Sequence, residues 1–277
     1  MVAGAGIGLG REVALKFANE GGVVFGTAES AAQVQDLKVA SGGRVSLAAC
    51  DITDMQGLRA WAEGVSEALD GAGLDVLVNL PVSRQTGPLE AMPLDAIRRE
   101  LELNVVGAIA VINAFLPSLR VARGRVLQIS SWIDSLAVPF SGLSAASTVA
   151  LAALSAAYRA EVRPSGVDVA MVSTDLVMPL GDTDRPTRSD RPIADLTPAQ
   201  RDFYGKRLAT ATTRLDELAI GGTDVAEVAA RVVQIAQAPA GAGHVPVGDR
   251  AIEIAAAARS KNDAELDAFR LSLVGLG

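Results

Sequence analysis

The chain has 277 residues and a formal net charge of −7, which suits one large α/β domain or two small ones. The acidic balance excludes the basic footprint of a nucleic-acid-binding protein, and a single cysteine, Cys50, excludes an intrachain disulfide framework. His244 is the single histidine, so a tetrahedral zinc site would need several carboxylates, and we expect no metal.

The predicted elements alternate between short apolar strands and helices with an apolar face. In chain order, we expect a strand at 2–3, a helix at 11–19, a strand at 23–25, a helix at 31–39, a strand at 45–49, a helix capped by Thr53 that runs through 61–69, a strand at 74–78, a long helical region at 94–119, a strand at 125–130, a helix at 144–162, a strand at 167–172, a helix capped by Thr223 at 225–237, a strand at 244–247 and a helical tail. Continuous apolar strands between helices are typical of a parallel sheet covered on both faces. The predicted fold is therefore α/β, a Rossmann-type doubly wound parallel sheet of about seven strands.

We expect residues 1–277 to form a single dinucleotide-binding domain, because no internal repeat is visible. The segment 181–222 interrupts the alternation and is too long for a simple connection. It is either a functional lid or a disordered loop. The helical character of 199–208 and 214–218 favours a substrate lid.

A cluster of glycines joins the first strand to the first helix, in the order Gly4-Ala5-Gly6-Ile7-Gly8-Leu9-Gly10. Glycine there permits a tight turn, close approach of the backbone to a pyrophosphate, and close packing of helix on strand. The helix N-terminus then offers free N–H groups to the phosphates. Only three residues precede Gly4, so the first strand is expected to be very short.

Motifs along nearly the whole chain resemble the short-chain dehydrogenase/reductase family. The spacing Gly4-x-x-x-Gly8-x-Gly10 matches that family's loop, Asn104 matches its helix asparagine, and Ser131 matches its strand-end serine. The resemblance implies a nicotinamide cofactor held by the loop and the strand ends. The residues implied in cofactor binding are Gly4, Ile7, Gly8, Leu9, Gly10, Thr27, Asp51, Ile52, Asn79 and Thr174.

Two strand ends depart from the family's pattern. Leu80-Pro81-Val82 follows Asn79 in place of the usual Asn-Ala-Gly. Val172-Ser173-Thr174-Asp175 stands where Asn-Pro-Gly is expected. The second departure falls near the expected position of the nicotinamide.

The same resemblance implies a catalytic group of Asn, Ser, Tyr and Lys, in which the tyrosine donates the proton and the lysine lowers the tyrosine pKa. Counting from Ser131, the tyrosine position is Ser144 and the lysine position is Thr148. We therefore expect Ser131, Ser144 and Asn104 to be the catalytic residues, with the two hydroxyls donating hydrogen bonds to a carbonyl. Serine hydroxyls are too weakly acidic to be efficient general acids near neutrality.

The two tyrosines and the four lysines do not restore the missing pair. Tyr158 lies fourteen residues beyond Ser144, about 21 Å along a helix, and Tyr204 could reach the site only from the predicted lid. A serine hydrolase using Ser144 and His244 is a minor alternative, because the second glycine of a nucleophile elbow is missing. Asp134 faces the substrate or is a solvated turn residue.

Cofactor preference is expected to depend on the end of the second strand. An acidic residue there would hold the ribose hydroxyls of NAD, but Thr27 and Ala28 offer none and Glu29 comes too late. Arg11 is the basic residue that follows the glycine loop. This pattern favours NADP(H) over NAD(H).

Three classes of function are compatible with these residues. The first is an NAD(P)H-dependent ketoreductase of atypical mechanism that reduces a ketone or quinone of a polyketide-like secondary metabolite, with the proton from substrate or water. It resembles divergent tailoring reductases of antibiotic pathways, the simocyclinone ketoreductase among them. A non-redox isomerase or cyclase and a catalytically dead nucleotide-binding protein are the alternatives. The retained glycine loop, Asp51 and Asn79 favour the ketoreductase.

The expected partners are a carbonyl substrate and further copies of the chain. The mixed charge of the predicted lid favours a large polar substrate. The helix at 144–162 is apolar almost all round, which predicts a homodimer or homotetramer. No basic segment followed by an apolar one comes after Met1, so we expect a cytoplasmic protein without nucleic-acid or membrane partners.

Overall fold

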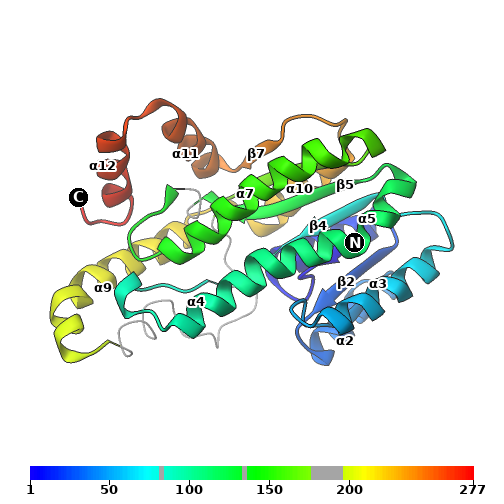
Figure 1. The fold of residues 1–277 in the computed structure, drawn as a ribbon, viewed down its shortest axis with the longest axis horizontal. Coiled ribbons are helices and arrows are strands. Elements are labelled where there is room, and N and C mark those ends of the chain that lie inside the picture. Colours follow the sequence, from blue (N-terminus) through cyan, green and yellow to red (C-terminus); the bar gives the residue numbers. More distant parts are fainter. Residues whose placement is uncertain (81–83, 133–135, 176–195) are drawn as a thin grey trace.

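The computed structural model of the protein describes residues 1–80, 84–132, 136–175 and 196–277. In this part of the chain, seven strands form one sheet in the order β3-β2-β1-β4-β5-β6-β7, and every neighbouring pair is parallel (Figure 1). The strands are β1 (Val2–Ala3), β2 (Val24–Ala28), β3 (Val45–Ala49), β4 (Val76–Asn79), β5 (Arg125–Ser131), β6 (Asp168–Thr174) and β7 (His244–Val247). The strand order reverses between β1 and β4, so the predicted doubly wound Rossmann-type fold is confirmed.

Helices cover both faces of the sheet, as the continuous apolar strands require. The helices on one face are α1 (Gly8–Asn19), α2 (Ala31–Ala40) and α10 (Val225–Gln237), and those on the other are α3 (Met55–Leu69), α5 (Ala108–Ala122) and α7 (Gly142–Val162). Beyond the sheet lie α4 (Leu94–Leu101), α9 (Pro198–Ile220), α11 (Asp249–Ser260) and α12 (Asp263–Leu273), with short 3₁₀ turns η1 (Leu89–Ala91) and η3 (Arg163–Ser165).

Two helices are capped one residue later than predicted. Asp54, not Thr53, caps α3, and Asp224, not Thr223, caps α10. An aspartate is at least as good an N-cap as a threonine, and each aspartate accepts backbone N–H groups of its first turn. The hydroxyl of Thr223 instead donates a hydrogen bond to Asp175 (2.8 Å).

The long helical region predicted at 94–119 is interrupted by a π-helical segment, η2 (Glu102–Gly107), between α4 and α5. A π segment inside an α-helix widens one turn, and such segments are common at functional sites. Here the widened turn carries the buried Asn104.

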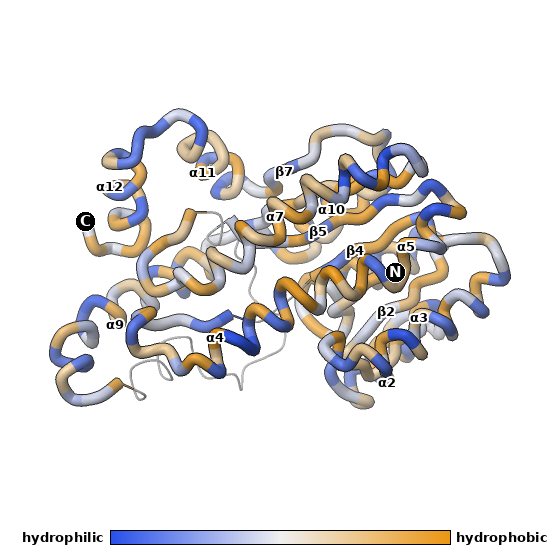
Figure 2. Tube along the Cα trace, viewed as in Figure 1, coloured by the Kyte–Doolittle hydropathy of each residue, from blue (hydrophilic) through white to orange (hydrophobic). Residues whose placement is uncertain are grey.

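The core formed by the described residues divides into three clusters. One lies between the sheet and α1 and α10, and includes Val13 and Val232. A second lies between the sheet and α3 and α5, and includes Leu58 and Phe115. Figure 2 shows the corresponding hydrophobic residues along the strands and α5, whereas α11 and α12 mix hydrophilic and hydrophobic residues. The third cluster joins α9, α11 and α12 beside the sheet (Figure 1).

The helical part of the predicted lid forms one continuous helix, α9, which spans both segments expected to be helical. Its start is held by a capping box between Thr197 and Gln200. Ala211 and Leu215 bury one face of α9 in the third cluster. The rest of the predicted lid, 181–195, lies outside the described residues, as does Asp134, and the lid role stays a prediction.

By length and composition, one helix of the described chain could cross a membrane, the stretch Leu94–Ala122. Its most apolar window is 33% buried, and its Ile112, Phe115 and Leu119 pack into the second cluster. A helix in the core of a protein can be equally long and apolar, so this stretch is weak evidence for a membrane partner.

Candidate active site

The predicted site residues follow the carboxyl ends of the parallel strands. The glycine loop follows β1, Asn79 ends β4, Ser131 ends β5 and Thr174 ends β6. Parallel strands bring these ends to one edge of the sheet, and ligands of doubly wound folds bind where the strand order reverses. That point lies between β1 and β4.

The glycine loop has a geometry that only glycine permits at two positions. Gly4 has φ +85°, and a Cβ built on Gly10 would lie 2.0 Å from the carbonyl oxygen of Gly4. The N-cap of α1, Ile7, makes no side-chain cap bond, and the first turn of α1 holds no acidic residue. The N–H groups at this helix start therefore suit an anionic phosphate.

Thr27 holds the glycine loop rather than presenting a free hydroxyl to a cofactor. The N–H of Gly4 donates to Thr27 Oγ1 (2.9 Å), and the N–H of Ala5 donates to the Thr27 carbonyl (2.8 Å). Thr27 itself is 3% exposed. Thr27 therefore supports the glycine loop in this structure, and its direct contact with a cofactor stays a prediction.

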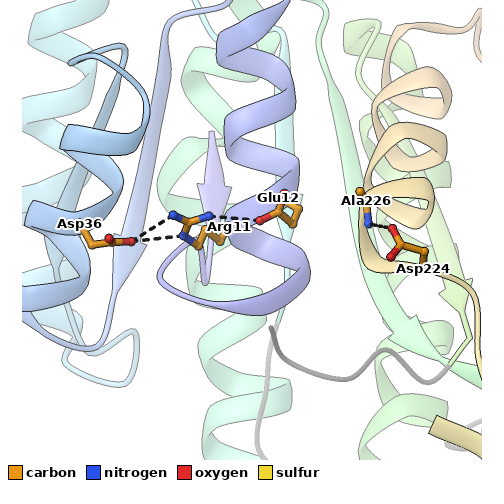
Figure 3. Close-up of polar contacts among 5 residues, drawn as sticks. All are labelled: Arg11, Glu12, Asp36, Asp224 and Ala226. Atoms are coloured by element: carbon orange, nitrogen blue, oxygen red, sulfur yellow. Dashed lines mark hydrogen bonds and ion pairs between the residues drawn. The ribbon is translucent and has the colours of Figure 1, made fainter. Parts of the chain in front are cut away.

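Arg11 lies in the first turn of α1, next to the glycine loop, and its guanidinium extends toward α2 (Figure 3). It donates to Asp36 of α2 (3.2 Å) and to Glu12 (3.2 Å). Figure 3 also shows Asp224, which accepts the N–H of Ala226 (2.8 Å) and so caps α10. The cation that could receive a 2′-phosphate is thus already paired with carboxylates in this structure.

Asp51 and Ile52 follow β3, at the predicted adenine side of the site. Asp51 is exposed, and its Oδ1 accepts from the N–H and the hydroxyl of Thr53 (2.9 and 2.8 Å). Ile52 packs toward Gly107, where an added Cβ would lie 3.1 Å from the Ile52 side chain. Asp51 therefore shapes the turn before α3 through its Oδ1.

Asn79 is fully buried at the centre of the sheet. Its Nδ2 donates to the Ala108 carbonyl and to Gln128 Oε1, both at 3.0 Å, while Gln128 Nε2 donates to the Asn79 carbonyl (3.2 Å). Among the described residues, its Oδ1 has no hydrogen-bond partner. The side-chain amide nitrogen of Asn79 therefore holds β4, β5 and α5 together, and the predicted cofactor contact of Asn79 stays a prediction.

Ser131 and Thr174 are register partners at the ends of β5 and β6. Thr174 Oγ1 donates to the Ser130 carbonyl (3.3 Å), whereas Ser131 Oγ is buried and has no hydrogen-bond partner within the described chain. An unpaired buried hydroxyl costs about 1–3 kcal/mol. Ser131 is therefore the predicted catalytic residue whose hydrogen bond remains available for a ligand.

Ser144 and Asn104 lie in one buried network, but Ser144 does not have the predicted free donor. Ser144 Oγ donates to Glu100 Oε1 (2.7 Å), and Asn104 Nδ2 donates to Ser147 Oγ (3.2 Å). Ser147 Oγ in turn donates to the Ser144 carbonyl (2.9 Å). In this structure the Ser144 hydrogen is directed at a carboxylate, and its donation to a substrate carbonyl stays a prediction.

Glu100 is the site residue that the sequence analysis missed. It lies in α4, is 0% exposed, and also accepts the N–H of Gln85 (2.6 Å). Its one sequence signal is its position four residues before Asn104, one helix turn away. Its charged neighbours Arg98, Arg99 and Glu102 give this part of the sequence the pattern of an exposed helix face, which conceals a buried carboxylate.

A hollow of about 320 Å³ lies beside the start of α7. Residues 87–90 and 137–140, together with Gly142 and Tyr204, line it. The rings of Tyr204 and Phe140 meet edge to face, 6.3 Å apart. Lost contact with water, and next the Glu90 carboxylate, raise the pKa of Tyr204 above 10, which makes it a weaker proton donor.

Tyr158 and His244 both lie away from Ser144. Tyr158, near the far end of α7, donates to Asn113 (2.8 Å), and burial is the main cause that raises the pKa of its hydroxyl. His244 Nε2 lies 2.7 Å from the hydroxyl of Ser173. The structure therefore does not support a hydrolase that pairs Ser144 with His244.

The match to known sequences falls on the part of the chain that carries this site. The model of the short chain dehydrogenase family matches residues 1–188. The chain belongs to the short-chain dehydrogenase family. In this short-chain dehydrogenase, Ser144 and Thr148 stand where the sequence analysis located the tyrosine and lysine positions.

Individual relatives cover different shares of the chain. It is 33% identical to retinol dehydrogenase 5 of Mus musculus over 172 residues, 62% of this chain and 54% of that protein. The chain thus spans about half the length of the retinol dehydrogenases it matches.

Solved short-chain dehydrogenases share the architecture. One from Streptomyces avermitilis is 25% identical, with TM-score 0.76, and is matched over 99% of this chain and 93% of that one. A metagenomic short-chain oxidoreductase solved with NADP is 29% identical, with TM-score 0.58, over 62% of this chain and 80% of that one.

Replacing Gly10 by alanine is expected to destabilise the fold by about 1–3 kcal/mol, because the added methyl meets the Gly4 carbonyl. Helix propensity alone predicts the opposite sign, a gain of about 0.5–1 kcal/mol. Gly64 of α3 is the matched control, since no atom lies within 4 Å of a Cβ added there. Urea denaturation should show Gly64→Ala stabilised and Gly10→Ala destabilised, and a stabilised Gly10→Ala would contradict the close contact.

His244 is expected to make stability fall as pH falls. Burial, and next the charge of Arg259, lower its pKa below 6.5 in the folded state, so the unfolded chain takes up the proton first. His244→Gln should therefore lose less in Tm than the wild type between about pH 7.5 and about pH 5.5. The glutamine can keep the Ser173 contact, and parallel melting curves of the two proteins would disprove the shift.

Proposed function

We propose that this short-chain dehydrogenase is an NADP(H)-dependent carbonyl reductase that works without the family's tyrosine and lysine. The observation that carries the proposal is the glycine cradle at the start of α1, which a Cβ on Gly10 would close. Ser131, buried and unpaired among the described residues, lies at the same sheet edge. When bound, the reduced nicotinamide supplies the hydride.

NADP(H) is the preferred cofactor in this proposal. No acidic side chain ends β2, where NAD-binding folds hold the ribose hydroxyls. The metagenomic oxidoreductase that shares the architecture was solved with NADP. Arg11 could turn from Asp36, which is exposed, toward a 2′-phosphate at little cost, since exposed ion pairs are weak.

The proposed substrate is a ketone or quinone of a polyketide-like secondary metabolite. The chain offers no tyrosine at Ser144, so the product alkoxide takes its proton from the substrate's own hydroxyl or from water. A hydroxyketone or quinone supports its own reduction in this way. The hollow beside α7, with Phe140 and Tyr204 in edge-to-face contact, suits such a ring system.

NADPH oxidation in the presence of hydroxyketones and quinones tests this function. We expect a decrease in NADPH absorbance that depends on the carbonyl compound, and weaker activity with NADH. Failure to bind NADPH would refute the proposal. No turnover by the wild type, with activity gained in Ser144→Tyr/Thr148→Lys, would instead identify a catalytically dead nucleotide-binding protein.

We also propose that the protein is a homodimer or homotetramer. The stretch Leu94–Ala122 is strongly apolar, yet only 33% of its most apolar window is buried within one chain. Val106 and, on the neighbouring α7, Val149 are 45% and 57% exposed. A symmetric partner would cover these apolar faces.

Sedimentation at micromolar concentration should therefore show a dimer or larger assembly. Val106→Glu is expected to shift the protein toward the monomer, because a charge would be buried in the interface. Val39→Glu on α2, where the valine is 69% exposed, is the matched control and should leave the assembly unchanged. A monomeric wild type would disprove the assembly.

A further inference from the structure

A buried carboxylate lies against the start of α7. Glu100 is 0% exposed and accepts hydrogen bonds from Ser144 Oγ (2.7 Å) and from the N–H of Gln85 (2.6 Å). Burying a charge is expensive unless strong donors replace water, and both distances are typical of charge-assisted hydrogen bonds. An apolar side chain of similar size would cost less desolvation free energy here, so we look for a functional role of the carboxylate.

The hydroxyl that meets Glu100 occupies the point where chemistry is expected. Ser144 lies in the first turn of α7, directly after the segment 137–142 that lines the hollow with Tyr204. Between Ser144 and Tyr158, α7 carries no ionisable side chain. The carboxyl group at the Ser144 end of α7 comes instead from Glu100 of the neighbouring helix α4.

The backbone around Ser144 is held independently of Glu100. Ser147 Oγ donates to the Ser144 carbonyl (2.9 Å) and accepts from Asn104 of the π-helical segment (3.2 Å). The first turn of α7 therefore does not rely on the carboxylate for its position. Ser144 meets Glu100 through its side-chain hydroxyl, the group that can carry a proton between the carboxyl group and a substrate.

We propose that Glu100 and Ser144 form a proton relay that replaces the tyrosine–lysine pair. The inference rests on the proposed reductase function and narrows its proton source: the solvent supplies the proton, and Ser144 with Glu100 delivers it in place of the substrate's own hydroxyl. As the carbonyl carbon gains the hydride, its oxygen takes the Ser144 hydroxyl proton, and Ser144 Oγ takes the proton of the Glu100 carboxylic acid. Glu100 is left as the carboxylate, the form that accepts the Ser144 hydroxyl in this structure. After product release, one proton taken up from the bulk solvent passes through Ser144 and restores the carboxylic acid.

The reverse reaction uses the same atoms. The alcohol O–H donates to Ser144 Oγ, whose own hydrogen already lies toward Glu100 (2.7 Å), and the carboxylate ends as the acid. A lone serine cannot do this, because its hydroxyl is a poor acid and a poor base near neutrality. With the Glu100 carboxyl group beside it, Ser144 can pass on a proton, which an isolated serine hydroxyl does poorly near neutrality.

Turnover by matched variants tests the relay. Glu100→Gln is expected to lower kcat by about a hundredfold, because the amide cannot exchange a proton, with the Kd for NADPH unchanged. Glu102→Gln makes the same chemical change at an exposed neighbour and should match the wild type. Ser144→Ala should lose as much as Glu100→Gln, and Ser144→Thr, which keeps the hydroxyl, should retain most of the activity.

Infrared spectroscopy of the cofactor-free protein gives a readout that needs no turnover. The difference between wild type and Glu100→Gln identifies the carboxylate band, and Ser144→Ala should shift it because a strong donor is lost. An unshifted band would overturn the relay. Full kcat in Glu100→Gln would overturn the relay and leave the reductase function standing, whereas a wild type that binds NADPH but reduces no carbonyl would overturn both.

Discussion

The contact between the glycine loop and the first turn of α1 is the constraint on which the site depends. A Cβ on Gly10 would lie 2.0 Å from the Gly4 carbonyl, so the helix start can approach β1 only through glycine. That approach places uncapped N–H groups where the strand order reverses between β1 and β4. The parallel sheet then delivers the ends of β4, β5 and β6 to the same edge, and with them the remaining polar groups.

Buried polar side chains divide into those that hold the site and those that remain for a ligand. Thr27 fastens the glycine loop, and Asn79 with Gln128 ties β4 to β5. Ser131 keeps a hydroxyl without a partner in the described chain, and Ser144 directs its hydrogen at Glu100. Buried polar groups almost always have a hydrogen-bond partner. The groups that are already paired within the protein support the site, and the remaining groups are the candidates for contact with a substrate.

Local pattern predicted the elements well and the polar roles less well. The strands at 45–49 and 244–247 have the predicted bounds, because short apolar runs between turn residues leave little choice. Thr53 and Thr223 looked like caps, but neighbouring aspartates took that place. Family spacing located Ser144 but not Glu100, because the pair is 44 residues apart and meets only when α4 packs against α7.

The sequence by itself determined the doubly wound sheet, the glycine loop, and the absence of a tyrosine and a lysine at Ser144 and Thr148. These features depend on residue identity and short-range spacing, which folding does not alter. Only the tertiary structure decided that Ser144 donates to a buried carboxylate, that Thr27 anchors the loop, and that Ser131 has no hydrogen-bond partner among the described residues. A hydrogen-bond partner is chosen in three dimensions, by which helices and strands come together and exclude water, and no local pattern encodes that choice.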